Sequence, residues 1–141
     1  MSAFLRLLTP PASARIQWQT GLVDLLHRLH DAGLLERFIP GFAHARDLPQ
    51  FNNYHKYTID EHSILTLGRC LALAAGDDWL GQVWQRLTRP RPLLLAALMH
   101  DLGKGYPGDH SEVGGGMARA ACERIGLPAE ETATVEFLVR N

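Results

Sequence analysis

The sequence has 141 residues, of which 46% are hydrophobic and 21% are charged, and its formal net charge is −1. This composition is typical of one globular domain with a hydrophobic core and excludes a disordered chain. The balanced charge argues against a nucleic-acid-binding protein, which usually carries a clustered basic excess. The longest apolar run, at 93–99, is too short to span a bilayer, and no signal peptide is evident in residues 1–8, so we expect a cytoplasmic protein.

Helical periodicity is clear in the first third of the chain. An apolar stripe at i, i+3, i+4 and i+7 predicts an amphipathic helix that Ser13 caps and Gly33 ends; the stripe consists of Leu22, Leu25, Leu26 and Leu29. Residues 34–40 are interpreted as a short apolar connector. Residues 41–53 have no clear period, so we predict an extended or irregular segment there.

A capping signal marks the start of the next helix. Thr58 and Glu61 have the spacing of the capping box, in which each side chain binds a free backbone N–H group of the first turn. We expect this helix to run through Leu71 and to stop at Gly76.

Four more helices are predicted, at residues 79–87, 93–102, 111–125 and 128–141. The helix at 93–102 begins after Pro92 and is apolar on nearly every side, which is typical of a helix at the centre of a core. Since no segment shows the alternation of a strand, we predict an all-α fold.

Seven histidines are the unusual feature of the composition. His100 and Asp101 lie at the end of the apolar helix, and His62 lies in the first turns of the capped helix. His110 follows Asp109 at the start of the predicted helix at 111–125. Each group alone has an ordinary structural explanation, such as a favourable charge at a helix end or an N-terminal cap. Together they place imidazoles and carboxylates at helix ends that a helical fold can bring to one point.

A mixture of imidazole and carboxylate groups suits Mn, Fe, Zn, Co or Ni better than it suits Mg or Ca, which prefer oxygen ligands. A divalent metal held in this way lowers the pKa of a bound water to ~7 and so supplies the nucleophile for hydrolysis of a phosphodiester. We therefore expect a divalent metal as cofactor, with Mg kept as a further candidate.

The sequence resembles the HD phosphohydrolase superfamily, whose signature is H…HD…D. His62 and the pair His100–Asp101, in the context HDLGK, carry this resemblance. Further segments are similar to the HD domain of bacterial PII uridylyltransferase/uridylyl-removing enzymes: GLLERFIP at 33–40, YHKYTIDEH at 54–62, HDLGKG at 100–105, GDHSE at 108–112 and FLVRN at 137–141. The resemblance implies a compact helical bundle of the HD type.

The resemblance also implies roles for individual residues. His62, His100 and Asp101 would bind the metal, and Asp101 would thereby take part in catalysis. Lys104 would stabilise the charge of the phosphate, and His110 would be a further metal or phosphate contact.

The implied reaction is removal of a uridylyl group from a tyrosine of the nitrogen-regulatory PII protein, in an enzyme that also has a nucleotidyltransferase domain and ACT-type domains. A phosphohydrolase of small nucleotides and a non-catalytic domain that binds metal or nucleotide are the alternatives.

We expect a single HD-type domain over residues 1–141, with a helical extension at 1–53 and the HD core at 54–141. In the family the pattern continues with a histidine and a final aspartate ligand. We therefore expect the core to be truncated at its C-terminus and to lack that ligand.

Two smaller features complete the expectations. Cys70 and Cys122 lie among apolar residues, so we expect buried thiols and no disulfide. Gly114, Gly115 and Gly116 should each cost a helix about 1 kcal/mol relative to alanine. They would either let this helix approach the metal site closely or mark a helix that is frayed or starts late.

Overall fold

The computed structural model describes residues 3–9, 15–49 and 57–141. In these ranges the chain forms helices, and the single β-type pairing is an isolated bridge between Pro49 and Thr58. The all-α prediction is therefore confirmed. In the same ranges, no helix combines the length and the apolar character that a membrane span requires.

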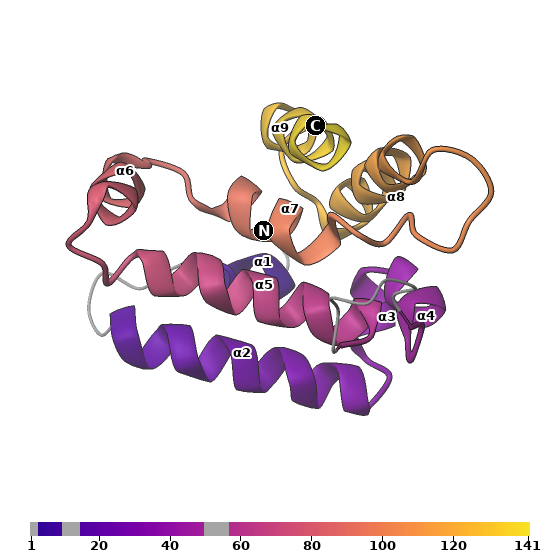
Figure 1. Ribbon diagram of the computed structural model, residues 1–141, viewed down its shortest axis with the longest axis horizontal. Coiled ribbons are helices and arrows are strands. Elements are labelled where there is room, and N and C mark those ends of the chain that lie inside the picture. The colour runs from indigo at the N-terminus through magenta and orange to yellow at the C-terminus, as the bar shows by residue number, and fades with distance from the viewer. Residues whose placement is uncertain (1–2, 10–14, 50–56) are drawn as a thin grey trace.

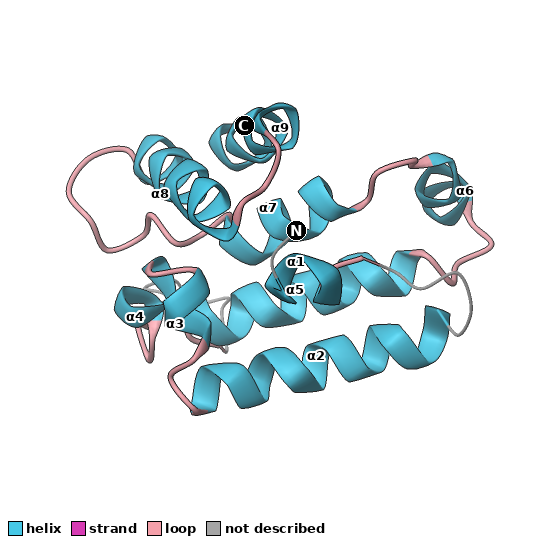
Figure 2. Cartoon of the chain, turned by 180° about the vertical axis from the view of Figure 1, so that it is seen from behind, coloured by secondary structure: helices cyan, strands magenta, loops and turns pink. Residues whose placement is uncertain are grey.

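The helices of the described part of the chain are, in order, α1 (Ala3–Leu7), α2 (Arg15–Asp31), α3 (Leu35–Phe38), α4 (Gly41–Ala45), α5 (Ile59–Leu73), α6 (Trp79–Arg86), α7 (Arg91–Met99), α8 (His110–Ile125) and α9 (Ala129–Arg140). Figure 1 shows α2 and α5 side by side, α7 next to α5, and α8 and α9 on the far side of α7. Seen from behind, α1 is in front of α5 (Figure 2). The ring of Phe4 on α1 stacks on Phe38 of α3 at a centroid distance of 4.8 Å.

The apolar helix α7 lies at the centre of the core, as its sequence predicts. All of its side chains from Leu94 to Met99 are buried. It packs against α5 on one side and α9 on another. The helix ends at Met99 rather than at the predicted Leu102, because residues 100–105 form a series of turns.

The predictions for residues 34–40 and for 41–53, as far as Pro49, were wrong. Instead of a connector and an irregular segment the chain forms α3 and α4, and α1 was not predicted at all. Helices of this length are unstable alone and show no readable period. They form because tertiary contacts bury side chains such as Leu35 and Phe42, both 0% exposed.

The predicted capping box does not form, although α5 begins at the predicted place. Thr58 is the residue before the helix, but its side chain makes no capping hydrogen bond. Glu61 contacts His27 of α2 at 3.0 Å instead of turning back to the start of its own helix. The predicted cap Ser13 lies outside the described residues.

The glycine stop signals were right for α2 and α8. Gly33 and Gly126 both have the left-handed backbone conformation that ends helices, with φ of 66° and 78°. For α5, the helix ends at Leu73 and a turn leads to the predicted stop at Gly76.

Both cysteines are free thiols, so the expected absence of a disulfide between them is confirmed. Cys122 is fully buried, as predicted, whereas Cys70 is only half-buried.

Candidate metal centre

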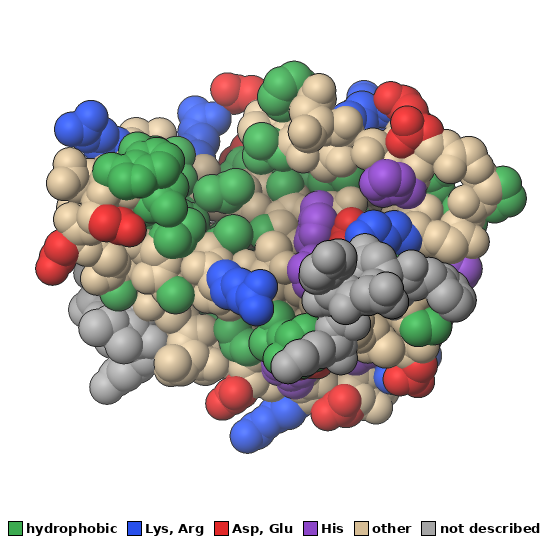
Figure 3. All heavy atoms as spheres, viewed as in Figure 1, with side chains coloured by type: hydrophobic (Ala, Val, Ile, Leu, Met, Phe, Trp, Pro, Cys, Tyr) green, Lys and Arg blue, Asp and Glu red, His purple; other side chains and the backbone are tan. Residues whose placement is uncertain are grey.

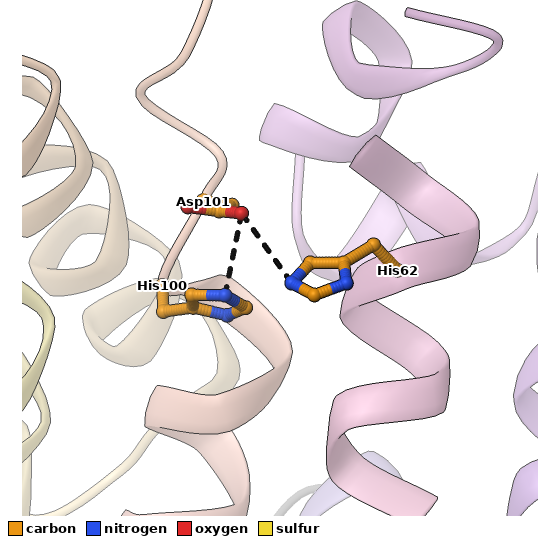
Figure 4. Close-up of side chains that lie close together, drawn as sticks. All are labelled: His62, His100 and Asp101. Atoms are coloured by element: carbon orange, nitrogen blue, oxygen red, sulfur yellow. Dashed lines mark ion pairs between the residues drawn. The ribbon is translucent and has the colours of Figure 1, made fainter. Parts of the chain in front are cut away.

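Three side chains from α5 and from the end of α7 meet at one point, and we call these three residues the metal group. His62 lies on α5, and His100 and Asp101 directly follow α7; each offers one ligand atom, and these atoms all lie within 4.8 Å of one another. Figure 4 shows His62 pointing across from α5 toward the other two side chains. The predicted ligand residues are thus brought together by helices that are distant in the sequence.

The spacing of these atoms fits a divalent metal. Asp101 Oδ2 lies 3.3 Å from His100 Nε2 and 3.6 Å from His62 Nε2. Ligand atoms at about 2.1 Å from a shared ion are roughly 3.0–3.4 Å apart in octahedral or tetrahedral geometry. Two imidazole nitrogens and one carboxylate oxygen are also the donors that transition metals prefer.

His100 has the orientation of a metal ligand. Its Nδ1 lies 2.9 Å from the carbonyl oxygen of Ala97, and because a carbonyl only accepts, the ring N–H group is assigned to Nδ1. In the neutral ring Nε2 then carries the lone pair that would bind a metal, whereas in the protonated ring Nε2 also carries a proton and donates toward Asp101 Oδ2, 3.3 Å away. A ligand histidine is usually held in this way, with one nitrogen donating to the protein and the other binding the metal.

Asp101 is buried and nevertheless ionised. Burial by itself would raise its pKa, but hydrogen bonds from His100 and Lys104 and the charges of both outweigh burial and hold the pKa of Asp101 well below its usual range. Lys104 Nζ donates to Asp101 Oδ2 at 2.8 Å. Burial would likewise lower the pKa of His100, and the contact with Asp101 raises it above its ordinary value.

A contact between two glycines holds the turn that carries His100 and Asp101 against α8. A Cβ atom on Gly103 would lie 2.5 Å from the backbone nitrogen of Gly114 and closer still to the carbonyl oxygen of His110. Only glycine fits this position, since the neighbouring atoms are backbone. The close approach therefore requires glycine at position 103, whereas a Cβ atom on Gly114 would lie at an ordinary 3.5 Å from Gly103 N. The predicted role of the glycine run in this approach stays a prediction; α8 is helical from His110 onward, so the run does not mark a frayed or late start.

Of the remaining predicted site residues, the structure places one beside the metal group and two outside it. Lys104 reaches Asp101 and so borders the metal group. The backbone of His110 lies against Gly103, but its side chain is exposed and is not part of the group of three. Asp109 accepts a hydrogen bond from Ser111 N at 2.8 Å and caps α8, which is its ordinary structural role.

His62, His100 and Lys104 are each partly exposed, so the group is open to solvent. Sequence reasoning missed two histidines of α2 that contact α5 beside His62. There His30 contacts Asp60 at 2.8 Å and His27 contacts Glu61 at 3.0 Å, immediately before His62. The only signal in the sequence was that His27 and His30 are three residues apart and so lie on one face of the helix. This spacing does not indicate which residues they contact.

The chain is similar to curated proteins over most of its length. The chain is 42% identical over 120 residues to the bifunctional uridylyltransferase/uridylyl-removing enzyme of Azospirillum brasilense, covering 82% of this chain and 13% of that enzyme. It is 41% identical over 124 residues to the enzymes of the same name from Xanthomonas axonopodis pv. citri (strain 306) and Xanthomonas campestris pv. campestris (strain B100). Each of these matches covers 84% of this chain and 14% of the enzyme.

The chain therefore spans only 13–14% of the length of these curated relatives. No solved structure matches it. The family model of the HD domain matches residues 59–141, which include every residue of the metal group. The chain belongs to the HD domain family.

Proposed function

We propose that this chain is a metal-dependent phosphohydrolase domain that removes uridylyl groups by hydrolysing a phosphodiester. The observation that supports this most directly is the group of His62, His100 and Asp101, whose ligand atoms lie within 4.8 Å of one another in a chain of the HD family. HD domains are a family of metal-dependent phosphohydrolases.

The proposed substrate is a uridylyl-tyrosine of a PII-type signal protein. Its support is the similarity to enzymes whose name includes "uridylyl-removing". These relatives are much longer than this chain. We therefore propose that nucleotidyltransferase and ACT-type domains of a full-length protein also take part in the recognition of PII.

In this proposal the chain's own residues have distinct tasks. His62, His100 and Asp101 would hold a divalent ion, with Mn, Fe, Zn, Co, Ni and Mg as the candidates. When bound, such an ion supplies Lewis-acid activation of water and of the phosphoryl group. Lys104, which is 2.8 Å from Asp101, places a positive charge at the edge of the site for the non-bridging phosphate oxygens. His110 is proposed as a further phosphate contact from the start of α8.

The test uses the p-nitrophenyl ester of UMP, whose leaving group resembles tyrosine, together with uridylylated PII protein. The purified chain loaded with Mn²⁺ should release UMP from both, and Asp101→Asn should abolish the release. Glu131→Gln is the matched control, because it removes a buried carboxylate that pairs with Arg91 at the other end of α7.

The alternatives give different results in the same assay. Hydrolysis of free nucleotides but not of the ester or the protein would favour a phosphohydrolase of small nucleotides. Metal binding without turnover of any of these substrates would favour a non-catalytic domain.

We propose further that the ligand set is completed by the family's final aspartate beyond Asn141. A chain extended by the family's continuation should then bind Mn²⁺ more tightly and turn over faster at saturating metal. Equal affinities of the short and extended chains would show that this ligand is dispensable.

A further inference from the structure

A partly buried polar cluster joins α2 to the first turn of α5. We call it the α5 anchor: His30, Glu36, Arg46 and Asp60. His30 and Asp60 are only 7% and 5% exposed, and neither belongs to the metal group. His30 Nε2 lies 2.8 Å from Asp60 Oδ2, and because a carboxylate only accepts, the ring donates this hydrogen bond. The same oxygen accepts the backbone N–H of Asp47 at 3.2 Å.

Arg46 fixes the other side of the His30 ring. Its guanidinium faces His30 Nδ1 at 3.3 Å and also donates to the carbonyl oxygen of His30. The Nε of Arg46 donates to Glu36 at 3.1 Å, so the arginine is itself held in place. With Nε2 as donor and Nδ1 as acceptor, both ring nitrogens of His30 have partners, and the ring orientation is fixed.

The anchor acts on α5 from the side opposite the metal group. Residues two apart on a helix point roughly 200° away from each other. Asp60 therefore faces α2, while His62 points toward His100 and Asp101 (Figure 4). A rotation of α5 about its axis would change the 3.6 Å separation of His62 Nε2 and Asp101 Oδ2.

We propose that His30 is a positioning residue of the metal site. Through Asp60 it fixes the rotation of α5 and so the distance of His62 from the turn that carries His100 and Asp101. His30 precedes the region matched by the HD family model, which begins at residue 59, so α2 contributes to a site whose ligands all lie within the matched region. This inference rests on the proposed metal-dependent function.

The test compares two substitutions of His30. In His30→Gln the side-chain amide can still donate to Asp60 and accept from Arg46, whereas His30→Ala removes both contacts. Each variant is titrated with Co²⁺, whose visible absorption reports on ligand geometry. We expect His30→Ala to bind Co²⁺ about tenfold more weakly with an altered spectrum, which is the usual effect of losing a residue that orients a ligand. His30→Gln should stay close to the wild type in both respects.

Glu131→Gln is the control for a general loss of stability. Its carboxylate is also buried and paired, with Arg91 Nη2 at 2.6 Å, but it belongs to α9. This variant should lose stability and keep the affinity and spectrum of Co²⁺. Unchanged Co²⁺ binding in folded His30→Ala would overturn the proposal, as would an equal loss of affinity in Glu131→Gln.

Amide hydrogen exchange without metal separates this inference from the proposed function. The N–H of Ile59 donates to Leu48 O and that of His62 to Thr58 O, both at 2.9 Å. These amides should exchange faster in His30→Ala than in His30→Gln; equal rates would overturn the inference. A wild-type chain that binds no Co²⁺ would refute the metal function, and the exchange rates would still decide whether His30 anchors α5. If His30→Ala does not fold, Asp60→Asn is put through the same measurements, with the same criteria.

Discussion

The carboxylate of Asp101 lies among three side chains that can carry positive charge: His62, His100 and Lys104. Asp101 is 7% exposed, so water cannot replace these partners. Its negative charge is therefore what keeps two imidazoles and an ammonium group close together. The same charge makes the group attractive to a divalent cation.

Removing any one ligand should weaken metal binding. We expect His62→Ala, His100→Ala and Asp101→Ala each to lower metal affinity by one to two orders of magnitude, because the ligand shell is left incomplete. Elemental analysis after loading with Mn²⁺ and calorimetric titration measure the effect. An Asp101→Ala variant with unchanged metal content would remove Asp101 from the ligand set.

The two cysteines should differ in reactivity. Burial raises the pKa of Cys122 to about 12, with Glu123 and Glu131 adding to the effect, and its side chain is 0% exposed. Cys70 is half-buried, and burial raises its pKa as well. At pH 8 a thiol reagent should therefore modify Cys122 only after unfolding, since the thiolate is the reactive form. Mass spectrometry of native and denatured protein checks this, and rapid native labelling of Cys122 would contradict it.

At the scale of elements, the contact of the turn at 100–105 with α8 depends on glycine at one position and not at another. Gly103 lies against the backbone of α8, whereas a Cβ atom on Gly116 would meet nothing within 4 Å. Gly103 contacts α8 and Gly116 is part of it, so the two positions form a natural pair for substitution.

Gly103→Ala should destabilise the protein by about 1–3 kcal/mol, because the added atom forces the turn away from α8. Metal affinity should fall with it, since the turn carries His100 and Asp101. Gly116→Ala should stabilise the protein by up to about 1 kcal/mol, because alanine favours the helix and has room. Urea unfolding gives both values, and a tolerated Gly103→Ala would show that the turn is not held by this contact.

The helices that could be predicted are the ones whose sequence carries its own signal. The apolar run of α7, the leucine stripe of α2 and the stop at Gly126 were all read correctly. The short helices α3 and α4 could not be predicted, since burial against other elements stabilises them. The predicted capping role of Glu61 was also wrong because of a tertiary contact: its carboxylate binds His27 on α2.

In the described part of the molecule, α7 packs against both α5 and α9, and α2 packs against α5. An exposed apolar stripe remains on α6, where Trp79 is 70% and Val83 is 49% exposed; Figure 3 shows hydrophobic side chains gathered over this helix.

The stability of the fold should depend on the charge of Glu36. Burial by itself would raise the pKa of Glu36, but the hydrogen bond and charge of Arg46 outweigh it, so the pKa lies below its ordinary value of 4.5. A carboxyl group with a lowered pKa stabilises the fold at pH above 4.5, and this contribution is lost as the pH falls through the folded-state pKa. Glu36→Gln should therefore be less stable than the wild type at pH 7, with the difference shrinking toward pH 3. Urea unfolding across this range is the measurement; a difference that grows on acidification would contradict the assignment.

The sequence by itself determined the helical class, the central position of α7 and the candidate ligands His62, His100 and Asp101, because helical period and short motifs are local properties of a chain. Only the tertiary structure decided that these three side chains meet while His110 remains exposed, since residues on α5 and α7 are brought together by packing. It also decided the partners of His30 and Gly103. Such partners lie far away in the sequence, and no local pattern specifies which distant residue will fill the space beside them.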